Sequence, residues 1–354
     1  MKVLVTGHKG YIGTVLVPKL VALGYDVKGL DSDLFADCTF GTEVQEIPWI
    51  KKDIRDVTSE DVKGVDAIIH LAGLSNDPLG DLDPNLTYAI NYQASVKLAK
   101  LAKEAGVSRF IFSSSCSNYG AGGEDLLTEN SAFNPVTPYG RSKVMVEQDV
   151  SPMAGPTFSP VFLRNATVYG VSPRLRFDLV LNNLVAWAFT SGRVFIKSDG
   201  SPWRPIVHVE DVAQAFIAVL HAPRESVHNQ AFNVGDTKEN YRVRELADMV
   251  KATVPGCHIE YAKDAGPDKR CYRVDCQKIL GMVAEFAPQW TAAKGAKELY
   301  DAYKETGLRL EEFEGIRYKR IDHIKDLIES GRLDRTLRWN KVQAISDHQE
   351  RACA

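Results

Sequence analysis

Hydrophobic and polar positions in the first half of the chain alternate between two patterns. Between short apolar runs, apolar residues recur at helical spacing. Strand-length and helix-length segments in alternation predict βαβ units around a parallel sheet. The apolar runs are almost continuous, as in strands that are covered on both faces. They predict strands at Lys2–Thr6, Asp26–Leu30, Val65–Leu71, Arg109–Ser113 and Pro160–Arg164.

Two of the predicted helices carry clear signals. The segment Asn85–Ala105 has apolar residues on one helical face. The segment Pro138–Val150 follows Thr137, a favourable N-cap, and starts with a proline at its first helical position. Further helices are expected at Glu210–His221 and Arg242–Val254.

The residue composition of the chain changes after about residue 170, where prolines and arginines cluster between helices. We therefore expect an α/β fold, a Rossmann-type doubly wound parallel sheet with a smaller C-terminal α/β substrate lobe. The expected division is residues 1–170 for the sheet domain, 171–290 for the lobe, which is interleaved with the core, and 291–354 for a charged helical segment. We assign that last segment no chemistry.

Composition narrows the function classes. Of 354 residues, 44% are hydrophobic and 25% are charged, which is typical of a globular protein. The net charge of −3 gives no basic surface for nucleic acid or an anionic membrane. Six cysteines without a CxxC pair indicate neither a metal site nor a redox dithiol. No apolar run reaches the roughly 18 residues of a membrane helix, and no secretion signal is visible, so we expect a cytoplasmic protein.

Three glycines follow the first predicted strand at GxxGxxG spacing. Gly7 suits the tight turn, Gly10 a close backbone approach to a pyrophosphate, and Gly13 close helix–strand packing. The phosphates would lie at the N-terminus of the helix that Tyr11 and Ile12 lead into. The position of the loop between strand and helix makes dinucleotide binding the favoured interpretation.

Two acids refine that interpretation. Asp31 lies 18 residues after Gly13, at the end of the second strand, where a carboxylate accepts from the ribose hydroxyls and repels a 2′-phosphate. NAD is therefore favoured over NADP, although a turn aspartate is an alternative. Asp53, followed by Ile54, would lie near the adenine amine, or would be an ordinary loop acid before Arg55.

Tyr139 and Lys143 lie one helical turn apart and project from the same face. An ammonium beside a phenol, whose reference pKa is about 10, favours the phenolate, so the tyrosine can act as a base. The alternative is a plain surface helix. Upstream, a buried strand ends in serines that include Ser115, at the sheet edge where ligands bind.

Six segments together resemble the extended short-chain dehydrogenase/reductases, specifically the nucleotide-sugar epimerase/dehydratase family. The resemblance implies Ser115 as the catalytic hydroxyl, Tyr139 as the base and Lys143 as its partner and ribose ligand. It also implies that Asn91 is the family's structural asparagine at the cofactor site, and that the stretch Leu71, Ala72 and Gly73 belongs to the same site. The segments are TGHKGYIG, IIHLAG at 68–73, FSSSCSNYG at 112–120, PYGRSK at 138–143, LRNATVYG at 163–170 and RPIVHVEDVAQAF at 204–216.

The same resemblance suggests how the substrate is held. Arg204, with Arg270 or Arg273, would bind the nucleotide diphosphate, because guanidinium groups donate in pairs. For the last two arginines a surface ion pair is an equal alternative. Asn182 resembles a nucleotide-contacting helix residue, and Thr167 stands where many members have asparagine. Ser75, Asn76 and Ser117 are candidate sugar contacts, with turn chemistry as the alternative for the first two.

Several residues bear on the reaction type. Dehydratases of the family carry aspartate and glutamate directly after the catalytic hydroxyl, and decarboxylases carry a glutamate two places after it. This chain has Cys116 and Ser117 at these positions. Cys116 is interpreted as packing rather than as an acid or base. His208 is expected to anchor the helix that follows it, and His8 to be a solvated loop residue.

The favoured function is an NAD-dependent nucleotide-sugar epimerase that acts at C4 through a transient 4-keto intermediate. One alternative is an NAD(P)H-dependent reductase of 4-keto-6-deoxy nucleotide sugars, and another is a non-catalytic dinucleotide-sensing protein. The expected cofactor is NAD, and no metal is expected. The resemblance also implies a homodimer through the helices at Asn85–Ala105 and Pro138–Val150.

Overall fold

A parallel sheet of seven strands forms the centre of the computed structural model, which describes residues 1–75, 83–263, 265–266 and 270–340. The strand order is β11-β7-β5-β4-β1-β2-β3, and every neighbouring pair runs parallel. The strands are β1 (Lys2–Thr6), β2 (Asp26–Asp31), β3 (Trp49–Lys51), β4 (Ala67–His70), β5 (Arg109–Ser115), β7 (Ser159–Asn165) and β11 (Gln230–Val234).

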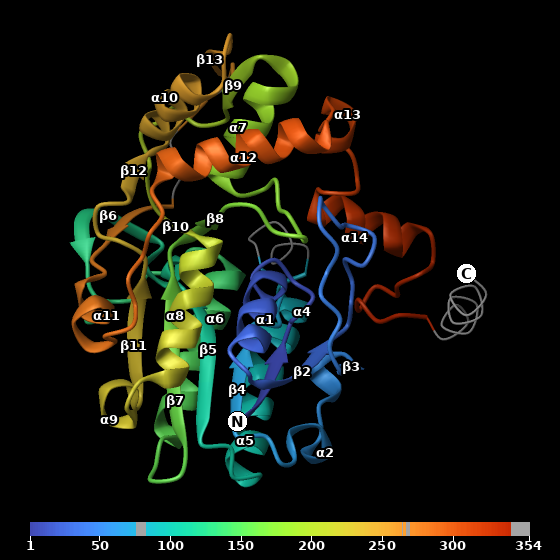
Figure 1. Ribbon diagram of the computed structural model, residues 1–354, viewed down its shortest axis with the longest axis vertical. Helices are drawn as coiled ribbons and strands as arrows, with labels where there is room; N and C mark the ends of the chain where they lie inside the picture. The colour runs from blue at the N-terminus through green and yellow to red at the C-terminus, as the bar shows by residue number, and fades with distance from the viewer. Residues whose placement is uncertain (76–82, 264, 267–269, 341–354) are drawn as a thin grey trace.

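Helices cover both faces of this sheet (Figure 1). One face packs on α1 (Gly13–Ala22) and α8 (Val209–His221), with α11 (Gln277–Met282) at its edge. The other face packs on α5 (Ala94–Glu104) and α6 (Pro138–Val150). The doubly wound Rossmann-type fold predicted from the alternating pattern is therefore confirmed, and the five predicted strands agree with the observed ones to within about two residues.

The predicted helix at Asn85–Ala105 is not one regular helix. It begins as α4 (Pro84–Thr87), passes through a π-helical turn η2 (Tyr88–Gln93) and continues as α5. The start of α6 is as predicted, since the Thr137 hydroxyl accepts from the backbone N–H of Gly140 at 3.2 Å. Short helical turns complete the sheet domain: η1 (Ile54–Asp56), α2 (Ser59–Val62), η3 (Cys116–Tyr119), η4 (Ser151–Met153) and α9 (Arg224–Val227).

A smaller lobe lies beyond the carboxyl edge of the sheet, at the top of Figure 1. Its core gathers apolar residues of three helices, α7 (Val180–Ser191), α10 (Val243–Thr253) and α12 (Ala292–Thr306). Its strands form small sheets that pair β12 (Asn240–Arg242), β10 (Trp203–His208) and β8 (Thr167–Tyr169); β13 (His258–Tyr261) and β9 (Arg193–Ile196); and β14 (Cys271–Val274) and β6 (Ala121–Leu127).

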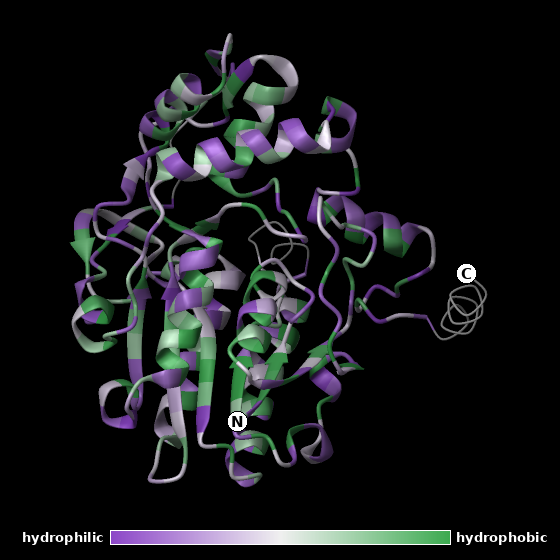
Figure 2. Ribbon diagram, viewed as in Figure 1, coloured by the Kyte–Doolittle hydropathy of each residue, from purple (hydrophilic) through white to green (hydrophobic). Residues whose placement is uncertain are grey.

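The C-terminal part of the chain returns from the lobe to the sheet. After α13 (Leu310–Phe313), helix α14 (Arg320–Glu329) lies beside the segment between β2 and β3 (Figure 1). His323 Nε2 lies 3.1 Å from the carbonyl oxygen of Leu34 in that segment. Figure 2 shows hydrophobic colouring along the central strands and much hydrophilic colouring on α12 and α14. Within the described ranges, no helix is both long and apolar enough to cross a membrane.

Candidate active site

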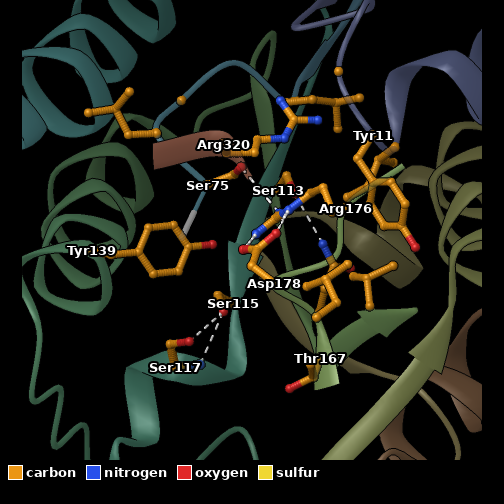
Figure 3. Close-up of a pocket in the computed structure, with 18 of the residues that line it drawn as sticks. Tyr11, Ser75, Ser113, Ser115, Ser117, Tyr139, Thr167, Arg176, Asp178 and Arg320 are labelled. Carbon is orange, nitrogen blue, oxygen red and sulfur yellow. Dashed lines mark hydrogen bonds and ion pairs between the residues drawn. The ribbon is translucent and has the colours of Figure 1, made fainter. Parts of the chain in front are cut away.

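A cavity of about 590 Å³ lies between the carboxyl ends of the central strands and the smaller lobe. This is the edge at which ligands bind in open parallel α/β sheets, because loops leave neighbouring strands there in opposite directions. Figure 3 shows side chains from β5, α6, α14 and the segment before α7, which carries Arg176 and Asp178, converging on it.

The glycine loop forms one side of this cavity. Gly7 has a φ of +73°, and a Cβ added there would lie 2.6 Å from the backbone nitrogen of Ala72. A Cβ on Gly13 would lie 2.5 Å from the carbonyl oxygen of Gly7. No side chain caps the N-terminus of α1, which Gly10, Tyr11 and Ile12 lead into. A bare helix N-terminus in a glycine cradle suits a pyrophosphate, so the residues present fit a dinucleotide.

Asp31 lies at the end of β2 and lines the cavity, as predicted. Its carboxylate accepts from the backbone N–H groups of Lys9 at 2.9 Å and Asp33 at 2.8 Å. Burial raises its pKa, while these two hydrogen bonds oppose the shift. The carboxylate is therefore fixed in place beside the glycine loop.

Asp53 shows both features that the sequence left open. It lines the cavity beside Ile54, and it also accepts from Arg55 Nε at 2.9 Å and caps the turn η1. The other predicted cofactor residues that line the cavity are Leu71, Ala72 and Gly73.

Asn91 is not among the residues that line the cavity. The side chain is buried in η2, where it accepts from the backbone N–H of Leu74 at 2.7 Å and donates to the Leu74 carbonyl at 2.9 Å. These bonds fix the loop that follows β4. Asn91 therefore positions the backbone beside the cavity residue Gly73, and its place at the cofactor site stays a prediction.

The three predicted catalytic residues meet in the cavity. Ser115 ends β5, and Tyr139 and Lys143 stand one turn apart near the start of α6. Lys143 Nζ donates to the Ser113 carbonyl at 2.8 Å and lies 5.6 Å from the centroid of the Tyr139 ring. Figure 3 shows the Tyr139 hydroxyl pointing into the cavity, and Ser115 hydrogen-bonds Ser117 at 3.0 Å.

Burial changes the charge behaviour of Lys143. Desolvation lowers the pKa of this lysine to about 7, against a small opposing effect of Glu147. The Lys143 side chain therefore exchanges between ammonium and neutral amine near neutral pH. An anion formed beside it would favour the ammonium form.

A buried network holds helix α6 against the sheet. Glu147 of α6 pairs with Arg164 of β7 at 2.7 Å and accepts from the Ser114 hydroxyl at 2.5 Å. Asn118 donates to the same carboxylate at 2.9 Å. Since Glu147 lies one turn after Lys143, this network sets the distance between the tyrosine and the end of β5.

Cys116 is buried and serves packing, as interpreted from the sequence. Its Sγ donates to the Arg164 carbonyl at 3.1 Å, and burial raises its pKa far above the usual range of a thiol. It does not line the cavity, whereas Ser117 does.

The predicted substrate residues divide into two groups. Ser75, Thr167, Arg204 and Arg270 line the cavity, and Ser117 belongs with them. Arg204 is held in place by hydrogen bonds to the carbonyl oxygens of Trp203 and Arg270.

Two predicted substrate residues lie elsewhere. Arg273 stacks its guanidinium 5.0 Å from the Trp203 ring centroid and does not line the cavity. Asn182 points into the lobe, where it accepts from the backbone N–H of Gly170 at 3.0 Å, while its neighbour Asn183 lines the cavity. Asn76 lies outside the described residues.

Sequence reasoning missed five charged residues that line the cavity, namely Lys52, Arg176, Asp178, Lys197 and Arg320. Arg176 pairs with Asp178 at 2.6 Å and donates to the Ser75 hydroxyl at 3.2 Å (Figure 3). The cluster of prolines and arginines after residue 170 was the only signal for this pair. Arg320 reaches the same cavity from α14, in the segment to which no chemistry was assigned.

The prediction for His208 is confirmed, and the prediction for His8 is wrong. His208 caps α8 as predicted, because its Nδ1 accepts from the backbone N–H of Glu210 at 3.2 Å. His8 is not solvated: it is 2% exposed, its ring lies beneath Gly29, and burial lowers its pKa to about 4. Within the described ranges, no cluster of three or more His, Cys, Asp or Glu side chains could hold a metal ion.

Comparison with known proteins agrees with this geometry. Residues 3–235 match the model of the NAD dependent epimerase/dehydratase family. A UDP-glucose 4-epimerase from Neisseria gonorrhoeae is 30% identical over 294 residues, covering 74% of this chain and 85% of that protein. One from Bacillus subtilis (strain 168) is 28% identical over 332 residues, covering 84% and 94%. The solved structure of MoeE5 with UDP-glucuronic acid and NAD is similar with a TM-score of 0.75 at 25% identity, covering 86% and 100%.

Proposed function

This chain belongs to the NAD-dependent epimerase/dehydratase family, and from that premise we propose that it is a nucleotide-sugar 4-epimerase. The chain is an NAD-dependent enzyme of the nucleotide-sugar epimerases and dehydratases. The choice of C4 inversion is the proposed part.

One observation carries the proposal. Tyr139, Lys143 and Ser115 face the same cavity as the glycine loop, and a buried ion pair locks their helix to the sheet. This arrangement brings a base, a cation and a hydroxyl to a single carbinol group. Oxidation and re-reduction at one carbon require these three groups.

The reaction follows from these side chains. The Tyr139 oxygen accepts the proton of the C4 hydroxyl, and Ser115 hydrogen-bonds the same sugar oxygen. The Lys143 ammonium stabilises the phenolate that takes the proton. NAD, when bound, supplies the hydride acceptor and later the donor. After the 4-keto sugar has turned its other face toward the hydride donor, Tyr139 returns the proton. Because the hydride that left the sugar comes back to it, the reaction consumes no reductant.

The residues around Ser115 disfavour dehydration at the neighbouring carbons of the sugar. Removing a C5 proton requires a base close to Ser115, where the chain has a buried thiol and a serine. Among the described cavity residues, Asp178 is the carboxylate on this side, and both its oxygens accept from Arg176, at 3.0 and 2.6 Å. A carboxylate held by a guanidinium is a weak base.

The substrate is a nucleoside diphosphate sugar. Arg204 and Arg270 line the lobe side of the cavity and are the proposed diphosphate ligands, because arginine donates in pairs to phosphate oxygens. Since the similar epimerases are named for UDP-glucose, UDP-glucose and its C4 epimer are the first pair to test.

We also expect two copies of the chain to pair through the helices α5 and α6. Tyr92 of η2 hydrogen-bonds Asp149 of α6 at 2.5 Å, so the two helical segments form one continuous surface. The dimer and the division of the chain at about residues 170 and 290 stay predictions.

The test replaces the proposed base. Tyr139→Phe should lower the rate of interconversion of the two UDP-sugars by about 10²–10⁴-fold, measured by NMR of the sugar anomeric protons, while NAD binding is kept. Tyr300→Phe, whose ring packs on Phe189 outside the cavity, is the matched control. Unchanged interconversion in the Tyr139 variant, or no interconversion by the unaltered enzyme, would contradict the proposal.

A further inference from the structure

The last described part of the chain packs over one end of the cavity. We call α14 and the turn after it, residues 320–340, the C-terminal clamp. Leu333 and Leu337 are buried in the same cluster as Leu4 of β1 and Leu30 of β2. The Trp339 indole donates to the carbonyl of Ser32, the residue directly after Asp31, at 2.6 Å. The clamp is therefore fixed where the ribose-binding carboxylate lies.

Two side chains of the clamp line the cavity itself, Arg320 and Leu337. Leu337 has a φ of +61°, a left-handed conformation that a branched side chain adopts only where its surroundings impose it. The packing of the clamp thus holds this residue against the cavity.

Arg320 is a buried cation whose charge is not neutralised. The residue is 6% exposed, and its guanidinium stacks 3.8 Å from the Phe35 ring centroid. Nη2 donates to the Arg174 carbonyl at 3.2 Å. Among the residues that the structure describes, no carboxylate lies within 4.0 Å of it. A guanidinium has five N–H donors, and a buried charge without an anion is costly.

The electrostatic surroundings of Arg320 favour an anion in the cavity. Burial, with Arg176 and Arg174 nearby, lowers its pKa to about 10, and Asp178 opposes the shift from a distance. Burial and like charges both disfavour the protonated form, and a bound anion would reverse this. Figure 3 shows Arg320 reaching the cavity from the side away from Ser115 and Ser117.

The position of Arg320 indicates which anion. Its stacking partner Phe35 lies in the segment 32–35, which follows Asp31 and lines the cavity. Asp31 is hydrogen-bonded to Lys9 of the glycine loop, so segment 32–35 and the N-terminus of α1 border the same half of the cavity. That half is the cofactor half, and its anion is the diphosphate of the dinucleotide.

We propose that the C-terminal clamp is part of the cofactor site, in which Arg320 pairs with the diphosphate and Leu337 and Trp339 close the adenosine end. The inference deepens the proposed function and rests on its cofactor site. A dinucleotide bound beneath the clamp leaves only when the clamp moves. Such retention suits a reaction that regenerates its cofactor in every cycle.

The test measures binding, with the full-length protein freed of nucleotide. Arg320→Met keeps an unbranched chain against Phe35 and removes the charge. Calorimetry should show NAD and ADP binding about ten- to a hundredfold more weakly, while adenosine and UDP bind as before. Arg335→Met, at an exposed position of the same clamp, is the matched control and should change nothing.

Three outcomes would overturn the proposal. Unchanged NAD and ADP affinity would remove Arg320 from the site, and weaker UDP binding alone would assign it to the sugar nucleotide. Equal loss for adenosine and ADP would indicate a distorted pocket. Arg320→Lys is the second variant and replaces the Met variant if that protein folds poorly. It keeps the positive charge and should therefore recover part of the NAD affinity. These binding results stand even if the enzyme inverts no sugar carbon, so the two proposals fail separately.

Discussion

Two walls of the same cavity are held in place by different interactions. The catalytic wall, made by the end of β5 and the start of α6, is fixed by the ion pair of Arg164 and Glu147, whose side chains are 5% and 6% exposed. The C-terminal clamp is tied to the sheet domain partly by the ion pair of Arg338 and Asp56, which are 39% and 49% exposed.

The two ion pairs differ in how much they stabilise the wall that they hold. Breaking a buried ion pair by removing one partner costs about 3–5 kcal/mol, whereas an exposed pair contributes about 0–1 kcal/mol. The buried pair therefore holds the catalytic wall strongly. The exposed pair contributes little to the clamp, which is held mainly by the packing of Leu333 and Leu337 and by the Trp339 hydrogen bond. Catalysis and cofactor retention are separable properties in this arrangement.

The largest expected effect tests the catalytic wall. Lys143→Met removes the ammonium beside Tyr139 and leaves an apolar chain that can pack on Phe112. Turnover of the UDP-sugar should fall by about 10²–10⁴-fold, because the phenolate loses its stabilising charge. A steady-state assay measures this, with Lys304→Met on the exposed surface of α12 as the control. A loss no larger than that of the control would refute the role of Lys143.

An intermediate effect is expected at the glycine loop, which both walls adjoin. In Gly13→Ala the new Cβ would lie 2.5 Å from the backbone oxygens of Gly7 and His8, so the loop must shift. We expect NAD affinity to fall about ten- to a hundredfold, corresponding to an overpacking cost of about 1–3 kcal/mol. Titration calorimetry checks this against Gly281→Ala, a helical site with open space around it. Equal NAD affinity in both variants would show that the loop does not cradle the cofactor.

The smallest expected effect tests the clamp. Trp339→Phe removes the hydrogen bond to Ser32 and keeps an aromatic ring in the turn. One hydrogen bond is worth about 0.5–1.5 kcal/mol, so NAD should dissociate about three- to tenfold faster, with saturated turnover unchanged. Stopped-flow displacement of NADH measures the rate. Trp290→Phe, which loses an indole bond to Glu210 outside the cavity, is the control, and an equal change in both variants would contradict the clamp.

The catalytic wall could be predicted from sequence because its signals are local. A glycine loop, a strand that ends in hydroxyls and a tyrosine–lysine pair one turn apart each fix their own geometry. The clamp has no such signal. Arg320 reaches the cavity only because α14 packs beside the segment between β2 and β3, and no spacing in the sequence encodes that contact.

The differences between the sequence expectations and the residues that line the cavity have geometric causes. Tyr272 lines the cavity and Arg273 does not, because neighbouring residues of strand β14 point to opposite faces. Asn183 lines it and Asn182 does not, because successive residues of α7 point in different directions around the helix. A histidine in a glycine loop looks solvated in sequence, but the absence of a side chain at Gly29 leaves room for the His8 ring.

The most direct test of the central claim, a retained and recycled cofactor, is to identify the nucleotide in the freshly purified enzyme. The protein is denatured, and the released nucleotide is identified and quantified by mass spectrometry. The account predicts NAD⁺ or NADH close to one per chain. An empty site, or one that holds NADPH, would mean an exchanging co-substrate and would contradict the proposal of a 4-epimerase with a clamped cofactor.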